Sequence, residues 1–371
     1  MKRNNRILIL ANDDEGLYQF RRMLLESLLG KGNKIYISCP KREYSHRLVE
    51  MGCVFFDTPI DRRGVNPKTD FKLFLRYLRI LKKIKPAVVF TYTIKPNVYG
   101  GIACELTKTN YFVNITGLGT SLENKSLVKK ISVLLYRMGI RKADCVFFQN
   151  TKNQQFFIDN KIHIKKQVLL PGSGVDLSEH SFREFPEQSS SIIFMMVGRV
   201  MKEKGVSEYI EAAHKIRKSG INAKFWLVGP MEEGLFTRKV EWAQKSGDVK
   251  YLGKRNDVPD LMSKAHCLIH PSYHEGMSNV ILEAAACGRP VLASNIPGCR
   301  EGIDDGVTGF LFEPKNTDSL VKAIQRFCSL SREQMAEMGK AGREKVEHEF
   351  DRNIVVAAYM NELKQLRMTH A

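Results

Sequence analysis

The chain has 371 residues, enough for two domains of ordinary size that each bury a hydrophobic core. Hydrophobic residues make up 43% and charged residues 26%, a balance that excludes a disordered chain and is typical of a soluble globular protein. No apolar run reaches the roughly 18 residues that a membrane span needs, and the apolar core of the N-terminus is too short for a secretory signal, so we expect a cytoplasmic protein.

The net charge of +18 is distributed unevenly. Residues 1–180 contain 31 Lys and Arg against 15 Asp and Glu, so almost all of the excess lies in the first half. A nucleic acid, an anionic membrane surface or a diphosphate-bearing substrate would each suit such a surface. Composition alone does not choose among these three partners.

The cysteines and histidines do not form a metal-binding or disulfide pattern. The eight cysteines include no C-x-x-C pair, and each lies in or beside an apolar segment, which predicts reduced packing residues. We interpret His214, His266, His270 and His274 as packed or surface residues because no H-x3-H or Cys/His set accompanies them.

The chain opens with a pattern that predicts a doubly wound domain. Residues 6–11 read as a buried strand, residues 12–16 as a polar loop, and residues 17–29 as a helix that ends at Gly30. Strands and helices continue to alternate, which indicates a parallel sheet. The further strands are residues 34–39, 54–56, 87–91, 111–115 and 145–149, and the clearest helices are residues 71–84 and 126–139.

Three adjacent acids, Asp13, Asp14 and Glu15, lie in the first loop. They suggest a metal site, but three ligands crowded in sequence without a distant partner suit Mg2+ poorly. We interpret them as solvated loop acids and expect no metal there.

Two later loops follow predicted strands, where ligands of parallel sheets collect. The first contains Lys95 and Asn97 around a proline, which suits contacts to hydroxyl or phosphate groups. The second contains Thr116, Gly117 and Gly119. An ordinary turn between strand and helix is the alternative for the first loop. For the second, turn chemistry alone is an equally good explanation of its two glycines.

Residues 126–142 form an amphipathic helix with two interpretations. A helix packed on the core is the default, and a helix lying on a membrane is the alternative. The predicted apolar face is Leu127, Ile131, Leu134, Leu135 and Met138, and the cations around it are Lys129, Lys130, Arg137 and Arg141.

Residues 171–191 are rich in Pro, Gly and Ser and are the best candidate for a linker. A new strand follows at residues 192–197, and then a basic loop, residues 198–205, leads into a helix. Arg199 and Lys204 place two cations in that loop, so it is a candidate site for an anion.

Residues 267–290 carry the densest group of functional residue types. A short strand ends at His270, a turn follows, and Ser278 or Asn279 caps a helix that Gly288 closes. The helix N-terminus suits a phosphate, and Gly276 allows close approach to the backbone. Glu275 and Glu283 flank it and would bind hydroxyl groups, so a sugar nucleotide fits the arrangement. Spacing alone fits two solvated glutamates as well.

The stretch HPSYHEGMSNVILEAAACGRPVLASNIPGCREGIDDGVTGFLFEP resembles the Glu-x7-Glu donor motif of retaining glycosyltransferases of family 4, in the bacterial branch that builds capsule, exopolysaccharide and O-antigen. The loop from Gly198 to Gly205 is similar to the family's G-R-x4-K-G diphosphate clamp. The first half resembles the branch more loosely, through Tyr18-x-Phe20-Arg21, TYTIKPN and TGLG.

The resemblance implies the GT-B architecture, two doubly wound Rossmann-like α/β domains that face each other across a cleft. Residues 1–180, with a crossing helix at about 350–371, would bind the acceptor, and residues 190–349 would bind the donor. The implied reaction moves a hexose or N-acetylhexosamine from a UDP-sugar to an undecaprenyl-diphosphate-linked saccharide with retention of configuration. No cofactor and no metal ion are expected, because protein cations would hold the departing diphosphate.

The resemblance also assigns roles to individual residues. The expected catalytic residues are Arg199, Lys204 and Glu275. The expected donor site is Gly198, Arg199, Lys204, Arg255, Val258, Glu275, Gly276, Met277, Ser278, Asn279, Val280 and Glu283. The expected acceptor side of the cleft is Gly16, Tyr18, Arg21, Lys95, Asn97, Thr116, Gly117 and Gly119. Many family members carry a His near this last segment, and this chain has none there, so no catalytic His is assigned.

A lipid-linked acceptor would account for the basic first half, and we expect peripheral binding to the inner face of a bacterial membrane. Two alternatives remain. A sugar-nucleotide epimerase on the same fold would need acid and base side chains beyond Glu275, and a nucleic-acid-binding protein would need basic and aromatic residues interleaved, a pattern that is missing.

Overall fold

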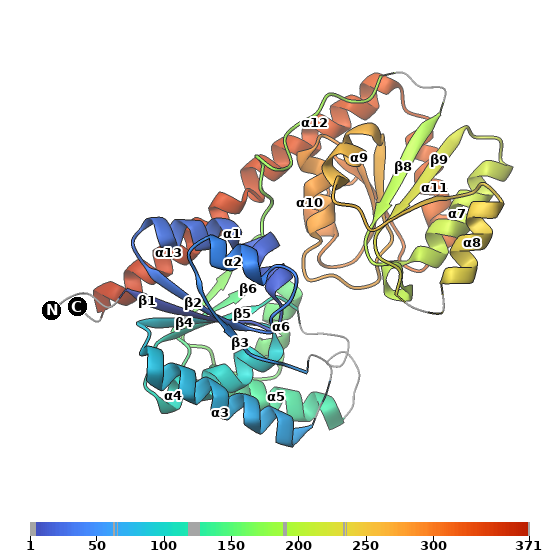
Figure 1. The fold of residues 1–371 in the computed structure, drawn as a ribbon. Coiled ribbons are helices and arrows are strands. Elements are labelled where there is room, and N and C mark those ends of the chain that lie inside the picture. The colour runs from blue at the N-terminus through green and yellow to red at the C-terminus, as the bar shows by residue number, and fades with distance from the viewer. Residues whose placement is uncertain are drawn as a thin grey trace. The chain divides into compact units, whose positions relative to one another are not determined.

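The computed structural model describes residues 5–61, 64, 66–117, 127–187, 191–232, 234 and 236–369. The chain divides into two compact units, each an α/β layered structure (Figure 1). The first unit is Met1–Ser173 together with Asn353–Ala371, and the second is Gly174–Arg352.

Each unit is built on one parallel sheet. The first sheet has the order β3-β2-β1-β4-β5-β6-β7, and the second has the order β10-β9-β8-β11-β12-β13. All described strand pairs in both sheets are parallel. The strands are β1 Arg6–Leu10, β2 Lys34–Cys39, β3 Val54–Asp57, β4 Val88–Tyr92, β5 Tyr111–Ile115, β6 Cys145–Phe148, β7 Gln167–Leu169, β8 Ile192–Val197, β9 Ala223–Val228, β10 Lys250–Gly253, β11 Cys267–His270, β12 Val291–Ser294 and β13 Gly309–Phe312.

Helices connect the strands and cover both faces of each sheet. In the first unit they are α1 Asp14–Gly30, α2 Ser45–Glu50, α3 Pro67–Ile84, the π-helix η1 Pro96–Gly100, α4 Gly101–Leu106, α5 Leu127–Ile140, α6 Thr151–Asp159 and α13 Arg352–Thr369. In the second unit they are the 3-10 turn η3 Lys202–Lys204, α7 Val206–Lys218, α8 Thr237–Lys245, α9 Val258–Lys264, α10 Asn279–Ala286, the 3-10 turn η4 Arg300–Gly302, α11 Thr317–Cys328 and α12 Arg332–Glu349.

Two apolar cores enclose the first sheet. Helices α3, α4 and α5 pack on one face, where Tyr77, Cys104 and Tyr136 are buried (Figure 1). Helices α1, α2 and α13 pack on the other face. The doubly wound α/β class expected from the sequence is therefore confirmed for both sheets.

The last helix, α13, completes the core of the first unit. Val355, Tyr359 and Leu363 are buried against the sheet, and the Tyr359 ring lies 4.5 Å from the Phe147 ring. The Tyr359 hydroxyl donates to Asn114 Oδ1 at 2.5 Å. The first unit is thus made of two segments that are distant in the chain.

The boundary between the units falls after Ser173, earlier than the expected end of the first domain at residue 180. The following segment is tied to the second unit because the Val175 amide donates to the Phe350 carbonyl at 2.9 Å. The buried Arg289 guanidinium also donates to the carbonyls of Arg183 and Glu184. Most of the predicted linker is therefore packed structure of the second unit.

The first loop is shorter than predicted, because α1 begins at Asp14. Asp13 caps this helix by accepting from the Gly16 amide at 3.1 Å. Asp14 is buried and accepts from the amides of Arg42 and Tyr44 and from the Ser45 hydroxyl. The interpretation of Asp14 as a solvated loop acid was wrong, since it anchors the turn that precedes α2.

The predicted apolar face of α5 was right for Leu135, which packs partly buried against the core, but wrong for three other residues. The buried residues of α5 are Val133, Tyr136 and Ile140, because they occupy the side of the helix that meets the sheet. Ile131, Leu134 and Met138 are 49%, 56% and 48% exposed. Ser126 lies outside the described residues. No helix in the described part of the chain combines the length and hydropathy required to cross a bilayer.

Candidate functional site

The predicted donor loops meet at the point where the order of the second sheet reverses. Strands β8 and β11 are neighbours, and the chain leaves them toward β9 and β12 respectively. In doubly wound sheets, ligands bind beyond the carboxyl ends of the two strands at this switch point. Residues 198–205 follow β8 and residues 271–278 follow β11, so both motif loops occupy that position.

Close packing holds the two loops together. Gly205 adopts φ +72°, and a Cβ atom there would lie 2.1 Å from the Pro271 carbonyl oxygen. The Tyr273 amide donates to the Glu203 carbonyl at 2.9 Å. Gly298, with φ +87°, leaves no room for a side chain against the Glu275 carbonyl. Glycine is required at both positions, and the backbone around Glu275 is fixed from two sides.

At the centre of this site, Lys204 and His270 both contact Glu275. Lys204 Nζ lies 2.5 Å and His270 Nε2 3.0 Å from Glu275 Oε1. Burial would raise the pKa of Glu275, but the hydrogen bond from His270 and the Lys204 charge outweigh it and hold that pKa well below its ordinary value. Glu275 is consequently a carboxylate at neutral pH. The remaining two protons of the Lys204 ammonium are available to other acceptors.

Helix α10 presents its N-terminus to the same site. Ser278 is the N-cap residue, but its hydroxyl lies 3.1 Å from His270 Nε2 and makes no capping hydrogen bond. The Ser278 amide donates to the Gly298 carbonyl at 2.8 Å. The amides of Asn279 and Val280 come next, and within the described residues they have no acceptor, as expected in the first turn of a helix. These two amides are the best placed to bind an anion.

Glu283 lies on α10 after that N-terminus, and it has different neighbours from Glu275. Burial raises the pKa of Glu283 above its ordinary value, and the charges of His180 and Arg352 oppose that shift. Gly276 is half-buried and Met277 is buried in the turn between the two glutamates. In the chain, Glu275 precedes the start of α10 and Glu283 lies within that helix.

Three other predicted donor residues lie outside this central group. Arg199 is on the same loop as Lys204, but its guanidinium is half exposed and pairs with Glu232 at 2.7 Å. Arg255 makes a bidentate pair with Asp257, at 2.7 and 2.6 Å. Val258 is the first residue of α9 and packs partly on the core. Both arginines lie beyond carboxyl ends of strands in the second sheet, without contacting Glu275.

In the first unit, the residues predicted from TYTIKPN make hydrogen bonds and an ion pair with neighbouring residues of the same unit. Asn97 is buried, accepts from the Thr91 hydroxyl at 2.7 Å and donates to the Asn114 carbonyl at 2.9 Å. Lys95 pairs with Asp70 at 2.6 Å, and the Tyr99 hydroxyl donates to the other oxygen of Asp70. The preceding residue Thr93 has φ +73°. A strained residue and a π-helix at a strand end are common at functional sites.

The other predicted acceptor residues that the structure describes are buried or half-buried. Arg21 is buried and lies 5.2 Å from the centre of the Tyr92 ring, and its place on the acceptor side stays a prediction. Gly16 and Tyr18 are half-buried in α1, and Arg47 lies over the Tyr18 ring. Thr116 and Gly117 are half-buried after β5, whereas Gly119 lies outside the described residues.

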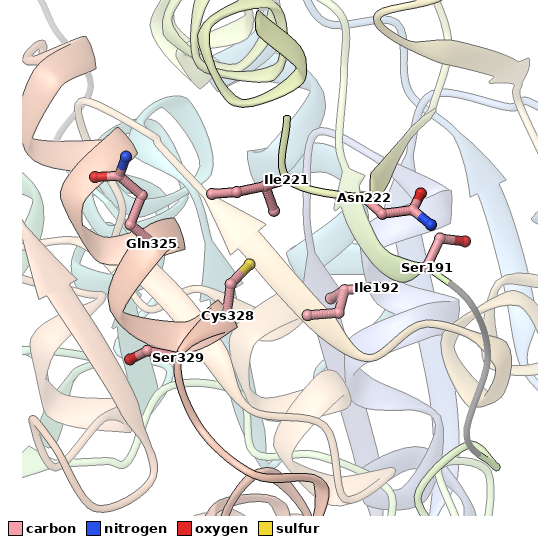
Figure 2. A pocket seen from close by; sticks show the side chains of 7 residues that line it. All are labelled: Ser191, Ile192, Ile221, Asn222, Gln325, Cys328 and Ser329. Atoms are coloured by element: carbon pink, nitrogen blue, oxygen red, sulfur yellow. The ribbon is translucent and has the colours of Figure 1, made fainter. Parts of the chain in front are cut away.

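A separate hollow of about 480 Å³ lies at the start of β8 (Figure 2). The loop of residues 198–205 follows the other end of that strand. Ile192, Ile221 and Cys328 gather in it, and its other lining residues are Ser191, Asn222, Gln325 and Ser329. No charged side chain lines it. A nucleoside diphosphate needs cations or amides for its phosphates, so this hollow does not fit the predicted donor.

Two protein-family models match the two halves of the chain. A glycosyl transferase 4-like model matches residues 6–150, and a glycosyl transferases group 1 model matches residues 178–345. The second match contains every residue of the site around Glu275.

Individual proteins match over longer stretches. N,N'-diacetylbacillosaminyl-diphospho-undecaprenol alpha-1,3-N-acetylgalactosaminyltransferase of Campylobacter jejuni is 25% identical and is matched over 97% of its length by 96% of this chain. UDP-Gal:alpha-D-GlcNAc-diphosphoundecaprenol alpha-1,3-galactosyltransferase of Escherichia coli is 25% identical, over 73% of this chain and 74% of that protein. Among solved structures, Anabaena HepE in complex with UDP superimposes with a TM-score of 0.79 at 18% identity, covering 97% of this chain and all of that one.

Proposed function

We propose that this chain, a family 4 glycosyltransferase of the GT-B fold, transfers a sugar from a UDP-sugar to an undecaprenyl-diphosphate-linked saccharide. The observation that carries the proposal is the group formed by Lys204, Glu275 and the α10 N-terminus at the switch point of the second sheet. The two bacterial relatives named above act, by their names, on undecaprenyl-diphosphate-linked sugars, which supports the acceptor class.

The site offers complementary groups for each part of a UDP-sugar. The Lys204 ammonium and the amides of Asn279 and Val280 provide positive charge and donors for the diphosphate. The Glu283 carboxylate would accept hydrogen bonds from the ribose hydroxyls. Oε2 of the Glu275 carboxylate would accept them from the hydroxyls of the transferred sugar. A hexose and an N-acetylhexosamine fit this assignment equally well.

Arg199 can bind the diphosphate only if its guanidinium leaves its present partner, Glu232. Its guanidinium pairs with the exposed Glu232, and exposed pairs of this kind contribute little free energy. A diphosphate carries more charge than one carboxylate and would compete for the guanidinium. We therefore keep Arg199 as a second phosphate ligand that must turn away from Glu232.

The proposed reaction retains the configuration of the transferred sugar. The bond from the anomeric carbon to the UDP oxygen breaks, and the acceptor hydroxyl forms a new bond to the same face of that carbon. The acceptor proton passes to the departing phosphate oxygen, which leaves UDP and a glycosylated lipid. Negative charge grows on the diphosphate as it departs, so Lys204 and the helix amides stabilise the transition state more than the ground state. In this scheme the protein supplies the positive charge and no metal ion is needed.

We propose that the acceptor is reached by peripheral binding to an anionic membrane. On the face covered by α3, α4 and α5, Phe71 and Leu106 are exposed together with Ile131, Leu134 and Met138. The exposed cations on α3 are Lys68, Lys72, Arg76, Arg79, Lys82 and Lys83. Apolar side chains among cations are the pattern of a helix that lies in a membrane interface. We call this surface the α3–α5 face.

Three of the four cations selected from the sequence, which lie on α5 or directly after it, have partners within the protein. Arg137 donates to the Asn160 carbonyl, Arg141 pairs with Glu105, and Lys129 lies over the Phe156 ring. Lys130 is exposed. On α3, Lys83 likewise lies over the Phe56 ring. We propose the other exposed cations of α3, which sequence reasoning missed, as the first candidates to contact lipid headgroups.

The test is incubation of the purified protein with labelled UDP-sugars and an undecaprenyl-diphosphate-linked saccharide. A labelled glycolipid that retains the anomeric configuration supports the proposal. An epimerised nucleotide sugar without glycolipid would instead favour an epimerase. Absence of both products across UDP-glucose, UDP-galactose and their N-acetylated forms would contradict it.

A further inference from the structure

His270 has an environment that its interpretation as an ordinary packed residue does not explain. It ends β11, is 3% exposed, and directs Nε2 toward both Glu275 Oε1 and the Ser278 hydroxyl, at 3.0 and 3.1 Å. Its Nδ1 atom is buried and has no hydrogen-bond partner within the described structure. Nε2 thus has two polar neighbours, and Nδ1 has none among the described residues.

These contacts select one tautomer of the ring. With the proton on Nε2, the ring donates toward the Glu275 carboxylate and only a lone pair is left unpartnered at Nδ1. With the proton on Nδ1, a buried N–H would lack an acceptor and the Nε2 lone pair would face a carboxylate oxygen. The tautomer with its proton on Nε2 is therefore the one that fits these contacts.

The hydrogen bond from His270 uses the same carboxylate oxygen that Lys204 contacts. Both donors reach Glu275 Oε1, and within the described residues no donor reaches Oε2. The carboxylate is therefore held by one oxygen and offers the other. His270 also draws the Ser278 hydroxyl away from the position where it would cap α10.

On the basis of the proposed function, we propose that His270 is a positioning residue that orients Glu275, so that Oε2 accepts a hydroxyl of the donor sugar. His270 does not touch the sugar in this arrangement and acts through Glu275. It accordingly contributes to recognition of the sugar and not of the UDP group.

The test compares His270→Gln and His270→Leu, each made in the parent and in a Glu275→Gln background. Leu removes the donor and keeps an apolar side chain of comparable bulk, and Gln keeps an N–H near the position of Nε2. Kinetic constants are measured with the most active UDP-sugar of the four above, and the dissociation constants of UDP and of that UDP-sugar are measured by calorimetry.

We expect His270→Leu to lower kcat/KM by about 10- to 100-fold, the effect of one lost hydrogen bond to a charged group. The affinity for UDP-sugar should fall toward that for UDP, while the affinity for UDP changes by less than about 3-fold. His270→Gln should restore most of the loss. In the Glu275→Gln background, His270→Leu should change kcat/KM by no more than about 2-fold, because coupled residues are not additive.

Equal losses of UDP and UDP-sugar affinity, or full additivity with Glu275→Gln, would overturn the proposal. The ratio of the two affinities needs no turnover, so a parent that binds UDP-sugar but transfers nothing would refute the proposed function and still test His270. Should the variants fail to fold, nitrogen NMR of the parent histidines decides, since a proton found on Nδ1 of His270 contradicts the assignment.

Discussion

Lys204 Nζ lies 2.5 Å from Glu275 Oε1, although 71 residues separate them in the chain. The pair joins the loops that follow β8 and β11, and both side chains are mostly buried, with 21% and 14% exposure. Removing one member of such a pair leaves an uncompensated charge, so each residue depends on the other.

Lys204→Ala should lower kcat by roughly 100-fold or more, because the variant loses one preorganised charge at the leaving group. Lys202→Ala is the matched control, since Lys202 lies on the same loop and is exposed. Steady-state kinetics with saturating donor measure the effect. Equal activity of the two variants would remove Lys204 from the diphosphate site.

Glu283→Ala should mainly raise the donor KM, by about 10-fold or more, since ribose contacts exist in the ground and transition states alike. Titration with UDP alone should show the same loss, because UDP contains the ribose. A variant with a lower kcat and unchanged UDP affinity would contradict the ribose assignment.

Transfer activity should survive EDTA, because Lys204 and the α10 amides are proposed to provide the charge that a metal ion supplies elsewhere. The measurement is the initial rate before and after chelation, with and without added Mg2+. A strict requirement for Mg2+ would refute the metal-independent scheme.

Replacing Ile131, Leu134 and Met138 together by Ser should weaken binding to anionic vesicles by at least about 10-fold, since each removes apolar area from the membrane interface. Co-sedimentation with vesicles of phosphatidylglycerol measures it. Trp242→Ser is the control, because Trp242 is equally exposed but lies on the second unit. Undiminished sedimentation of the triple variant would exclude α5 from the membrane surface.

The free energy of unfolding should fall between pH 7 and pH 5. Burial, with the charges of Arg289 and Arg332, lowers the pKa of His266 from 6.5 to about 4. As the pH falls below 6.5, His266 becomes protonated in the unfolded chain but stays neutral in the folded chain. The contribution of His266 to the free energy of unfolding is therefore present above pH 6.5 and is lost toward pH 4. At pH 5 the loss from this group is about 2 kcal/mol.

Urea unfolding at the two pH values measures this loss, and His266→Asn is the informative variant. The Asn oxygen replaces Nδ1, which accepts from the Ile193 amide, but it does not titrate. The variant should lose about 2 kcal/mol less between pH 7 and pH 5 than the parent. An identical pH dependence in both proteins would refute the role of His266.

The loops that we propose as the donor site are the part of the candidate site most accessible from sequence. Gly205 and Gly276 mark turns beside strand ends, and Lys204 and Glu275 are the charged residues that such turns present. The pairing of Lys204 with Glu275 was not predicted, because periodicity gives no distance between two loops. His270 was missed as a partner for the same reason. Its position at the end of a strand, five residues before Glu275, was the available signal.

The errors in the first unit have a common physical origin. Apolar residues occur all round α5, so periodicity could not decide between the Val133 side and the Leu134 side. Asp14 and Asn97 are polar residues in predicted loops, yet both are buried. Each is hydrogen-bonded to a segment remote in sequence. A local sequence pattern shows that a residue is polar, but it does not show which distant residue will form its hydrogen bonds.

The return of α13 to the first unit has a consequence for synthesis on the ribosome. Phe112 and Phe147 belong to the core that Tyr359 completes, so they stay uncovered by this helix until more than 200 further residues have been made. The second unit is contiguous and needs no later segment. The half of the protein that is translated first is therefore finished last, and a chain that ends before residue 353 would expose an aromatic surface rather than simply lack a tail.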